Sequence, residues 1–428
     1  MTRDARTWAF TIDERPVIIE EPVKRGHFFV IGKTRMGKST FFEHAIRDDI
    51  DHERGFCLID PHGDLAERVL DAIPRRLINR TIYLNVGDFD YPFGFNIFDN
   101  IPADQQATVG QNVIGIFKRI YSEFFGPRME FLWELANLAL LTSGKATLLN
   151  LERFLTDPKF RASVIAHPLL RDRDPLVREF WAEKFPRWPE HLREEAIIPI
   201  VNKIGQVNSN PILRRIVNQT DHRLDLSECF SDGRFVIVNL AQGLIGTKAA
   251  SLLGSLFVSA LFLSALGRTK LPPGARTPFR IYIDEIGSFA DPSSLPQILA
   301  ESAKYGLSLW CACQYLNQLP DIVRDALLGN ATGLIAFRIG ADDAETLARE
   351  VGLLLPQQFE QLVTLDRHEF FYREFGATVG SALRAKLNPP PSLPTTSCRS
   401  EIINQSRRRY CTPCEKVDAD LLQSRNSF

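Results

Sequence analysis

The stretch "GHFFVIGKTRMGKSTFFEHAI", residues 26–46, decides the fold. Its first seven residues form an apolar run that predicts a buried strand, and the residues after Ser39 have the apolar spacing of a helix. Between the two lies G-x-x-x-x-G-K-S without a mismatch, at Gly32, Gly37, Lys38 and Ser39. A strand, a Gly-rich loop and a helix in this order are the context in which this pattern forms a phosphate-binding P-loop.

The residue types of this loop suit ATP and Mg²⁺. Glycines let backbone N–H groups turn inward around the phosphates, and the N-terminus of the following helix adds its positive dipole. We expect Lys38 to reach the β- and γ-phosphates and the Ser39 hydroxyl to bind Mg²⁺. A chance match or a decayed loop is the alternative. The predicted cofactor-binding residues are Gly32, Thr34, Gly37, Lys38, Ser39 and Thr40.

The carboxylates that complete such a site should end a neighbouring apolar strand. The segment "RIYIDE" (280–285) supplies Asp284 and Glu285 in this position. We expect Asp284 to hold Mg²⁺ through water and Glu285 to orient or polarise the attacking water. The alternative for this pair is a helix cap at the end of a core strand.

Two further polar residues also end predicted strands. Gln314 follows "LSLWCAC" and can contact both the γ-phosphate and the attacking water, or it can be an ordinary turn amide. Asp60 ends "GFCLID" and either supports the metal ion or caps a turn, and the residues favour neither interpretation.

The order of elements predicts one α/β domain that is split by a helical insertion. Strands are expected at 26–32, 55–60 and 81–86 with helices between them, which favours a parallel sheet with right-handed crossovers. Strand patterns return at 234–240, 279–285, 307–314 and 333–340. The predicted boundaries are 1–100 with 231–388 for the discontinuous α/β nucleotide-binding domain, 101–230 for an inserted all-α domain, and 389–428 for a Pro/Ser linker and a polar tail with the composition of a partly disordered segment.

Composition excludes few classes of protein. The chain has 428 residues and a formal net charge of −1, so a nucleic-acid or membrane-surface partner requires a local patch. The tight basic run "SRRRY" (406–410) is more typical of a solvated tail. Seven scattered cysteines fit a reducing cytosol, and Cys411 with Cys414 lacks the second ligand pair that a structural zinc site needs.

One uncharged run of 18 residues, 249–266, lies at the short end of the range of lengths that span a membrane. Ser251, Ser255 and Ser259 recur every four residues along it and place small residues on one side of a helix. Predicted strands lie on both sides of the run in the sequence. We therefore expect a buried helix, no transmembrane segment in this chain, and a cytoplasmic protein that a partner can recruit to the inner face of the membrane.

Six segments together resemble the conjugative coupling-protein ATPases of type IV secretion, the TraD/TraG class, within the HerA/FtsK group of DNA-translocating motors. The resemblance covers roughly residues 20–385, including the position of the helical insertion. The segments are "GKTRMGKST", "LIDPHGDLAERVL", "FGPRMEFLWELANLAL", "RFVIVNLAQGLIG", "IYIDEIGSF" and "ACQYLNQLPDIVRDALLGNATGLIAFRIG".

The resemblance implies a RecA-like P-loop NTPase domain with a parallel-rich central sheet, interrupted by an all-α domain. It also implies a homo-hexamer with ATP between subunits and DNA in the central channel. The expected function is ATP-driven translocation of DNA in conjugative transfer, with relaxosome or secretion-channel proteins as partners.

Three features depart from the family pattern. The N-terminal transmembrane helices of coupling proteins are absent, as is the N-terminal barrel of HerA motors, which leaves a minimal motor, a membrane-less variant or a fragment as alternatives. Family members often place an arginine that acts in a neighbouring subunit before the strand of the sensor glutamine, and here that segment has Lys304. Arg338 and Arg128 are the other candidates, and all three can equally be ordinary surface or capping residues.

Two other functions stay open. One is a HerA-like motor for DNA processing or phage defence, which would need a separate nuclease because this chain carries no nuclease signature. The other is a nucleotide-gated platform that recruits substrates through its helical domain and hydrolyses ATP slowly.

Overall fold

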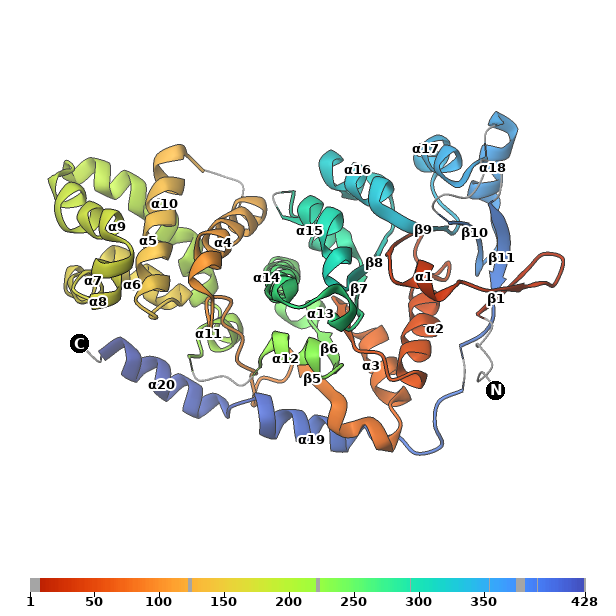
Figure 1. Ribbon diagram of the computed structural model, residues 1–428, viewed down its shortest axis with the longest axis horizontal. Coiled ribbons are helices and arrows are strands. Elements are labelled where there is room, and N and C mark those ends of the chain that lie inside the picture. Colours follow the sequence, from red (N-terminus) through yellow and green to blue (C-terminus); the bar gives the residue numbers. More distant parts are fainter. Residues whose placement is uncertain are drawn as a thin grey trace. The chain divides into compact units, whose positions relative to one another are not determined.

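The computed structural model describes residues 8–121, 125–220, 224–292, 294–353, 355–374, 382–390 and 392–426. The chain divides into two compact units, each discontinuous in sequence. The sheet unit comprises Met1–Leu84, Asp225–Ala241 and Ser264–Gln405, and the helical unit comprises Asn85–Leu224, Gln242–Leu263 and Ser406–Phe428. Figure 1 shows their elements in the colours of the sequence.

In the described residues, a sheet of eleven strands forms the centre of the sheet unit, in the order β2-β1-β11-β10-β9-β3-β8-β7-β4-β6-β5. The strands β9, β3, β8, β7, β4 and β6 are mutually parallel. Their bounds are β1 Ala9–Thr11, β2 Pro16–Val17, β3 His27–Ile31, β4 Phe56–Asp60, β5 Thr81–Asn85, β6 Phe235–Asn239, β7 Phe279–Asp284, β8 Leu307–Cys313, β9 Ala331–Ala336, β10 Glu369–Glu374 and β11 Leu383–Leu387.

The central strands are short apolar runs because both faces of a parallel sheet are covered. Every residue of β3, β4, β6 and β8 is buried. Trp310 of β8 stacks on Phe28 of β3 at 4.1 Å and on Phe41 at 6.0 Å between ring centroids. All seven predicted strands are present as β3 to β9, which confirms the predicted parallel-rich sheet.

Helices cover both faces of this sheet (Figure 1). The connections β3–α2–β4 and β4–α3–β5 cross the sheet in one direction, whereas β7–α15–β8 and β8–α16–β9 cross in the other. Right-handed crossovers therefore place α2 and α3 on one face and α15 and α16 on the opposite face. The helix bounds are α1 Glu21–Lys24, α2 Lys38–Asp51, α3 Asp64–Ala72, α12 Leu226–Ser231, α15 Leu295–Glu301, α16 Asp321–Asn330, α17 Ala341–Val351 and α18 Pro356–Thr364.

The antiparallel side of the sheet was not predicted. β10 pairs antiparallel with β9, and β11 pairs antiparallel with β10 and with β1. These strands place β3, which leads into the P-loop, in the interior of the sheet. They also bring the start of β10 and the end of β11 to the edge at which β3 ends, because β10 runs opposite to β3 and β11 runs with it.

The helical unit includes most of residues 101–230, the range predicted as an inserted all-α domain, together with Gln242–Leu263 and Ser406–Phe428. Inside it, Arg119 of α4 donates to the hydroxyls of Ser251 and Ser255, and Asn112 of α4 donates to that of Ser259. The serine side of α14 therefore faces polar groups of α4. The helices of this unit are α4 Gln106–Ile120, α5 Pro127–Thr142, α6 Leu148–Thr156, α7 Pro158–Ile165, α8 Pro168–Arg173, α9 Pro175–Glu179, α10 Glu190–Asn208, α11 Pro211–Val217, α13 Gln242–Ile245 and most of α14 Thr247–Leu266.

Among the residues that the structure describes, one helical stretch is long and apolar enough to cross a membrane, Thr247–Lys270. Of its most apolar 18-residue window, 83% is buried inside the protein. This burial agrees with the predicted core helix.

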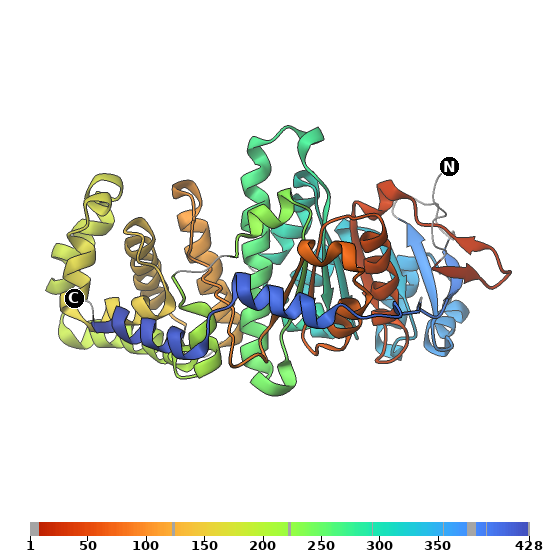
Figure 2. The same ribbon diagram turned by 90° about the horizontal axis from the view of Figure 1, so that it is seen from below.

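The C-terminal tail is more regular than its composition indicates. It forms α19 Arg399–Tyr410 and α20 Cys414–Asn426. The guanidinium of Arg399, in the sheet unit, pairs with Glu67 and Asp71 of α3, and Figure 2 shows α19 beside that part of the chain. In the helical unit, Arg407 pairs with Asp88 at 2.7 Å and Asp418 with Arg215 at 2.6 Å. Long-range ion pairs thus order a segment that has few apolar residues.

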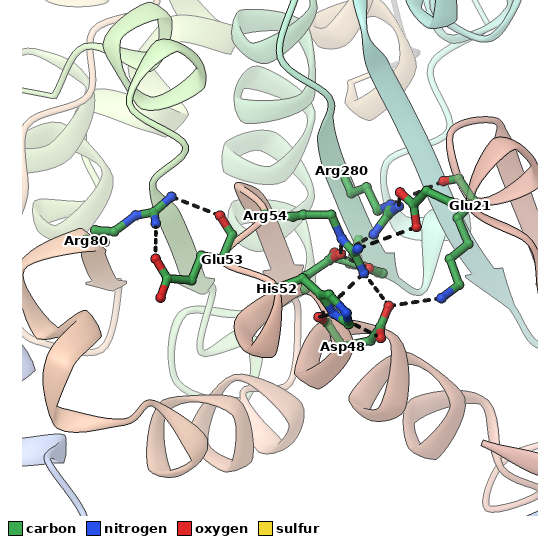
Figure 3. A network of polar contacts seen from close by, with 10 residues as sticks. Glu21, Asp48, His52, Glu53, Arg54, Arg80 and Arg280 are labelled. Atoms are coloured by element: carbon green, nitrogen blue, oxygen red, sulfur yellow. Dashed lines mark hydrogen bonds and ion pairs between the residues drawn. The ribbon is translucent and has the colours of Figure 1, made fainter. Parts of the chain in front are cut away.

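A buried network of charged residues joins the end of α2 to β7 (Figure 3). The guanidinium of Arg280, the second residue of β7, donates to Asp49 of α2 and, at 2.9 Å, to Glu21 of α1. Asp49 also accepts hydrogen bonds from Tyr282, at 2.6 Å, and from Arg54, at 2.9 Å. Burial raises the pKa of Asp49, and the positive charges of Arg280 and Arg54 oppose that shift. Removal of either Arg280 or Asp49 alone would therefore leave the other as an unpaired charge in the core.

Arg280→Met should strongly destabilise the sheet unit because it leaves Asp49 without its main cation. The expected loss is about 3–5 kcal/mol, measured as a lower urea midpoint by circular dichroism. Arg324→Met is the matched control, because Arg324 pairs with Asp321 at the surface, where the expected change is below about 1 kcal/mol. The double variant Arg280→Met/Asp49→Leu should recover much of the loss. Equal midpoints for Arg280→Met and the control would show that the network does not stabilise the fold.

His27 should make stability depend on pH. It is buried at the start of β3, its Nδ1 accepts a hydrogen bond from the Leu309 N–H at 2.9 Å, and burial lowers its pKa from 6.5 to about 4. Between these values the unfolded chain binds a proton that the folded chain does not, so stability falls as pH falls from 6.5 towards 4, by at most about 1.4 kcal/mol per pH unit. His27→Asn keeps an acceptor and should flatten this part of the curve of unfolding free energy against pH. Identical slopes for the wild-type protein and His27→Asn would show that His27 is not the source of this pH dependence.

Candidate nucleotide-binding site

The P-loop follows β3 and leads directly into α2, which begins at Lys38. Gly37 has φ +132°, a conformation that side chains disfavour, and a Cβ there would lie 2.7 Å from the Phe337 ring. At Gly32 a Cβ would lie 2.6 Å from Cβ of the same phenylalanine. The two glycines of the motif are thus required by close packing against the residue that follows β9.

Lys38 is folded back onto its own loop. Its Nζ donates to the carbonyl oxygens of Gly32, at 2.6 Å, and Lys33, at 3.2 Å. Burial lowers the pKa of Lys38, and the charges of Asp284 and Glu285 oppose that shift. The ammonium group is therefore held at the centre of the loop, close to where a P-loop binds phosphate.

Ser39 and Asp284 meet at the edge of the sheet where β7 ends and α2 begins. They are separated by 245 residues in sequence, yet the Ser39 hydroxyl donates to Asp284 Oδ2 at 2.9 Å. Ser39 belongs to the first turn of α2 and Asp284 is the last residue of β7. The two residues predicted to share Mg²⁺ are thus in direct contact.

Asp284 has the electrostatic character of a cation ligand. Burial, followed by the charge of Asp60, raises its pKa to about 6, while the Ser39 hydrogen bond and Lys38 act in the opposite direction. A hydroxyl and a buried carboxylate that would be stabilised by positive charge are the donors that Mg²⁺ prefers, alongside phosphate oxygens. The residues present therefore fit the predicted ion.

Glu285 and Gln314 form a polar chain with the P-loop. Gln314 Nε2 donates to Glu285 Oε2 at 3.0 Å, and its Oε1 accepts from the Thr34 hydroxyl at 3.2 Å. Glu285 has φ +93°, which is strained for a residue with a side chain and is found mainly at functional sites. Burial raises its pKa, which makes the carboxylate a stronger base. The predicted base, sensor and loop residue are therefore linked in one network.

Asp60 caps a helix. Its Oδ1 accepts from the His62 N–H, and its Oδ2 from those of Leu65 and Ala66, each at 2.9 Å. Of the two interpretations left open by the sequence, the structure supports the cap. Asp60 acts on the site through its charge, which raises the pKa of Asp284.

A cavity of about 690 Å³ lies over the P-loop in the sheet unit. All predicted site residues except Gly32 and the three candidates for action in trans line it. Sequence reasoning missed part of its wall. The polar pair "RH" before the alternating segment "EFFYRE" could have indicated Arg367 and His368 at a strand start, whereas no local pattern marks the rest. The missed lining residues are Arg35, Glu43, Arg47, His62, Asp64, Leu65, Arg68, Arg367, His368, Pro390 and Leu393.

The three candidate trans-acting residues do not line this cavity. Lys304 pairs with Glu301 at 3.3 Å just before β8, so the length of that strand, about 20 Å, separates it from Gln314 at the other end. Arg338 Nε donates to the Leu365 carbonyl beside the P-loop. Arg128 pairs at 3.2 Å with Glu195 in the helical unit. Their action in trans stays a prediction.

All seven cysteines are free, and Cys398 is buried whereas Cys411 and Cys414 are partly exposed. In the described ranges, no group of three or more His, Cys, Asp or Glu side chains has the arrangement of a metal site. A P-loop Mg²⁺ site does not need such a group, because phosphate and water supply most of its ligands.

Part of the chain matches a family model. Residues 278–353, from β7 to the end of α17, match the family described as the TraM recognition site of TraD and TraG. This segment includes Asp284, Glu285 and Gln314. No curated protein sequence matches the chain.

Solved structures match nearly the whole chain at low identity. The bacterial conjugative coupling protein TrwBdeltaN70 is 16% identical with a TM-score of 0.64, over 93% of each chain. The plasmid coupling protein TrwB with the ATP analogue ADPNP gives the same values. VirB4 of Thermoanaerobacter pseudethanolicus is 15% identical with a TM-score of 0.59, over 90% of this chain and 96% of its own. The chain thus has the fold of TrwB and VirB4, which confirms the predicted RecA-like architecture and, with the TraD/TraG family match over residues 278–353, the resemblance indicated by its motifs.

Proposed function

We propose that this chain is an ATP-driven motor that moves DNA in conjugative transfer through type IV secretion. The observation that carries the ATPase part is the contact of Ser39 with Asp284 beside the Glu285–Gln314 pair. A chance P-loop or a decayed one would not bring these four side chains together from three separate strand ends.

Each residue then has a defined task. Backbone N–H groups of the loop and Lys38 bind the phosphates and neutralise the charge that develops during transfer. Glu285, whose pKa burial raises, orients the attacking water and accepts its proton. Gln314 bridges this base to Thr34, so the loop that senses phosphate is connected to the base.

Ser39 and Asp284 would hold Mg²⁺. When bound, the ion would neutralise part of the negative charge that develops on the phosphates. The raised pKa of Asp284 means that this carboxylate is stabilised by a nearby cation.

The DNA part of the proposal rests on the fold and on the family match. The TrwB structures are described as a conjugative coupling protein, and the matched family as a TraM recognition site. By analogy, the working form would be a homo-hexamer in the cytoplasm that a membrane partner recruits, with relaxosome or channel proteins as partners. A ring needs only a few basic residues per subunit, because phosphate contacts carry no sequence code.

A neighbouring subunit would complete each site. Lys304 lies at the far end of β8 from its own Gln314, so it can act only in another subunit, and its exposed ammonium is a point charge without the planar fork of arginine. Arg338 is engaged with Leu365 beside its own loop, which favours a structural task for its side chain.

Two variants should separate binding from hydrolysis. Lys38→Ala should abolish ATP binding, because it removes the buried ammonium from the loop. Glu285→Gln should retain ATP and lower turnover by about 10²–10⁴-fold, because only the base is lost. Phosphate release and calorimetric binding measure the two effects, and Glu345→Gln, at an exposed glutamate of α17, is the control. Unchanged turnover in Glu285→Gln would overturn its assignment as the base.

DNA should stimulate the ATPase of the wild-type protein. We expect a several-fold higher rate with single- or double-stranded DNA, and a stimulation that weakens as salt rises. Rates of phosphate release with and without DNA at two salt concentrations test this. Equal rates would reject the motor and favour the nucleotide-gated platform. A stimulated ATPase that copurifies with a nuclease would instead support the DNA-processing alternative.

A further inference from the structure

The cavity has two ends, and the catalytic groups occupy one of them. Asp284, Glu285 and Gln314 end β7 and β8, which lie on one side of β3 in the sheet. The triphosphate must therefore point its γ-phosphate towards this side. The other side of β3 carries β9, β10 and β11, and the cavity wall there consists of residues that the proposed chemistry does not use: Arg367, His368, Pro390 and Leu393.

The turn that carries His368 is fixed to the P-loop itself. The His368 N–H donates to the Met36 carbonyl at 2.9 Å, and the His368 carbonyl accepts from the Leu387 N–H at 2.9 Å. Arg338 holds the Leu365 carbonyl at the start of the same turn. His368 has φ +67°, an uncommon conformation for a residue with a side chain. The backbone thus holds this side chain at the loop in a strained conformation.

The imidazole of His368 is poised beside the phosphate-binding backbone. A Cβ on Gly37 would lie 3.2 Å from Nδ1 of His368, so the ring packs on the glycine. In the described residues this buried nitrogen has no hydrogen-bond partner. A buried polar atom without a partner costs about 1–3 kcal/mol, and a ligand recovers this cost when the ring turns far enough for the nitrogen to reach it. Burial, with the charges of Arg367 and Lys386, lowers the pKa of the ring, which favours the neutral form.

The segment after β11 completes the wall and is held against α2. The Asn388 carbonyl lies 3.0 Å from His44 Nε2, and the Ser392 carbonyl accepts from Arg47 at 3.3 Å. Arg47 is itself paired with the buried Glu43 at 2.8 Å. These contacts leave Pro390 and Leu393 facing the cavity, and Leu393 is 49% exposed. An exposed leucine beside a proline and an imidazole is a surface that suits a flat, partly apolar ring.

We propose that His368, with Arg367, Pro390 and Leu393, forms the nucleoside subsite of the ATP site, in which the imidazole hydrogen-bonds the ribose or base and the apolar pair packs on the base. This inference rests on the proposed function, because it assumes that the loop binds a nucleoside triphosphate. It assigns binding of the nucleoside to the antiparallel side of the sheet, which no sequence motif marks.

Calorimetry with two ligands tests the subsite in the full-length protein. With Mg²⁺ present, ADP and inorganic tripolyphosphate both engage the loop, but only ADP carries a nucleoside. His368→Gly is compatible with the positive φ and should raise the Kd for ADP about tenfold while leaving that for tripolyphosphate unchanged. Leu393→Ala, at an exposed position that cannot disturb folding, should raise the Kd for ADP by a smaller factor, again without an effect on tripolyphosphate.

His62→Gly is the matched control, because His62 lines the same cavity on the side of Glu285 and its charge acts on that carboxylate. It should leave the ratio of the two Kd values unchanged. Equal weakening of both ligands by His368→Gly, or an effect on neither ligand in both His368→Gly and Leu393→Ala, would overturn the subsite. A wild-type protein that binds neither ligand would reject the proposed function, whereas one that binds both but shows no ADP-selective loss in either variant would reject the subsite alone.

Discussion

The placement of α2 against β7 is the constraint on which the rest of this structure depends. At one end of the helix the Ser39 hydroxyl meets Asp284, and at the other end Asp49 meets Arg280 and Tyr282. Both contacts are polar and both are buried or partly buried, so neither can be exchanged for water at low cost. The strand that ends in the proposed catalytic carboxylates and the helix that follows the P-loop are consequently held in register at two points. A shift of either element by one residue would break both contacts.

The two contacts differ in how their charges are balanced. The contact around Asp49 is a network of two arginines, two aspartates and a tyrosine, in which each carboxylate has cationic partners. The contact between Ser39 and Asp284 is different, because burial and the charge of Asp60 raise the pKa of Asp284 to about 6. The charges at the Asp49 end of α2 are paired within the protein, whereas at the Asp284 end Lys38 offsets the carboxylates in part and a further cation would stabilise them. The C-terminal end of α2 therefore stabilises the fold, and its N-terminal end belongs to the candidate nucleotide-binding site.

Much of the fold and the catalytic half of the site could be predicted from sequence because their signals are local. Buried parallel strands are continuous apolar runs, and the P-loop, Asp284 with Glu285, and Gln314 each follow such a run directly. The antiparallel strands gave weaker signals, since β11 reads "LRAKL" with two charges, and β1 and β2 have three and two residues. The tail helices depend on ion pairs such as Arg399 with Asp71, whose partners are more than 300 residues apart in sequence. The cavity wall proposed to bind the nucleoside was missed for the same reason, because His368 and Leu393 come together only through the pairing of β10 with β11.

The buried strand β8 lies between a residue of the candidate site, after its carboxyl end, and an exposed lysine, before its amino end. At its carboxyl end Gln314 joins Glu285 to Thr34, and just before its amino end stands Lys304, paired with Glu301 at the surface. All seven residues of β8 are buried between β3 and β7, so the strand cannot bend independently of its neighbours. A displacement that moved the backbone of β8 would therefore have to move β3 and β7 with it. In a ring that places Lys304 near the site of the next subunit, this stiffness is what would allow one site to influence the next, and it needs no hinge between them.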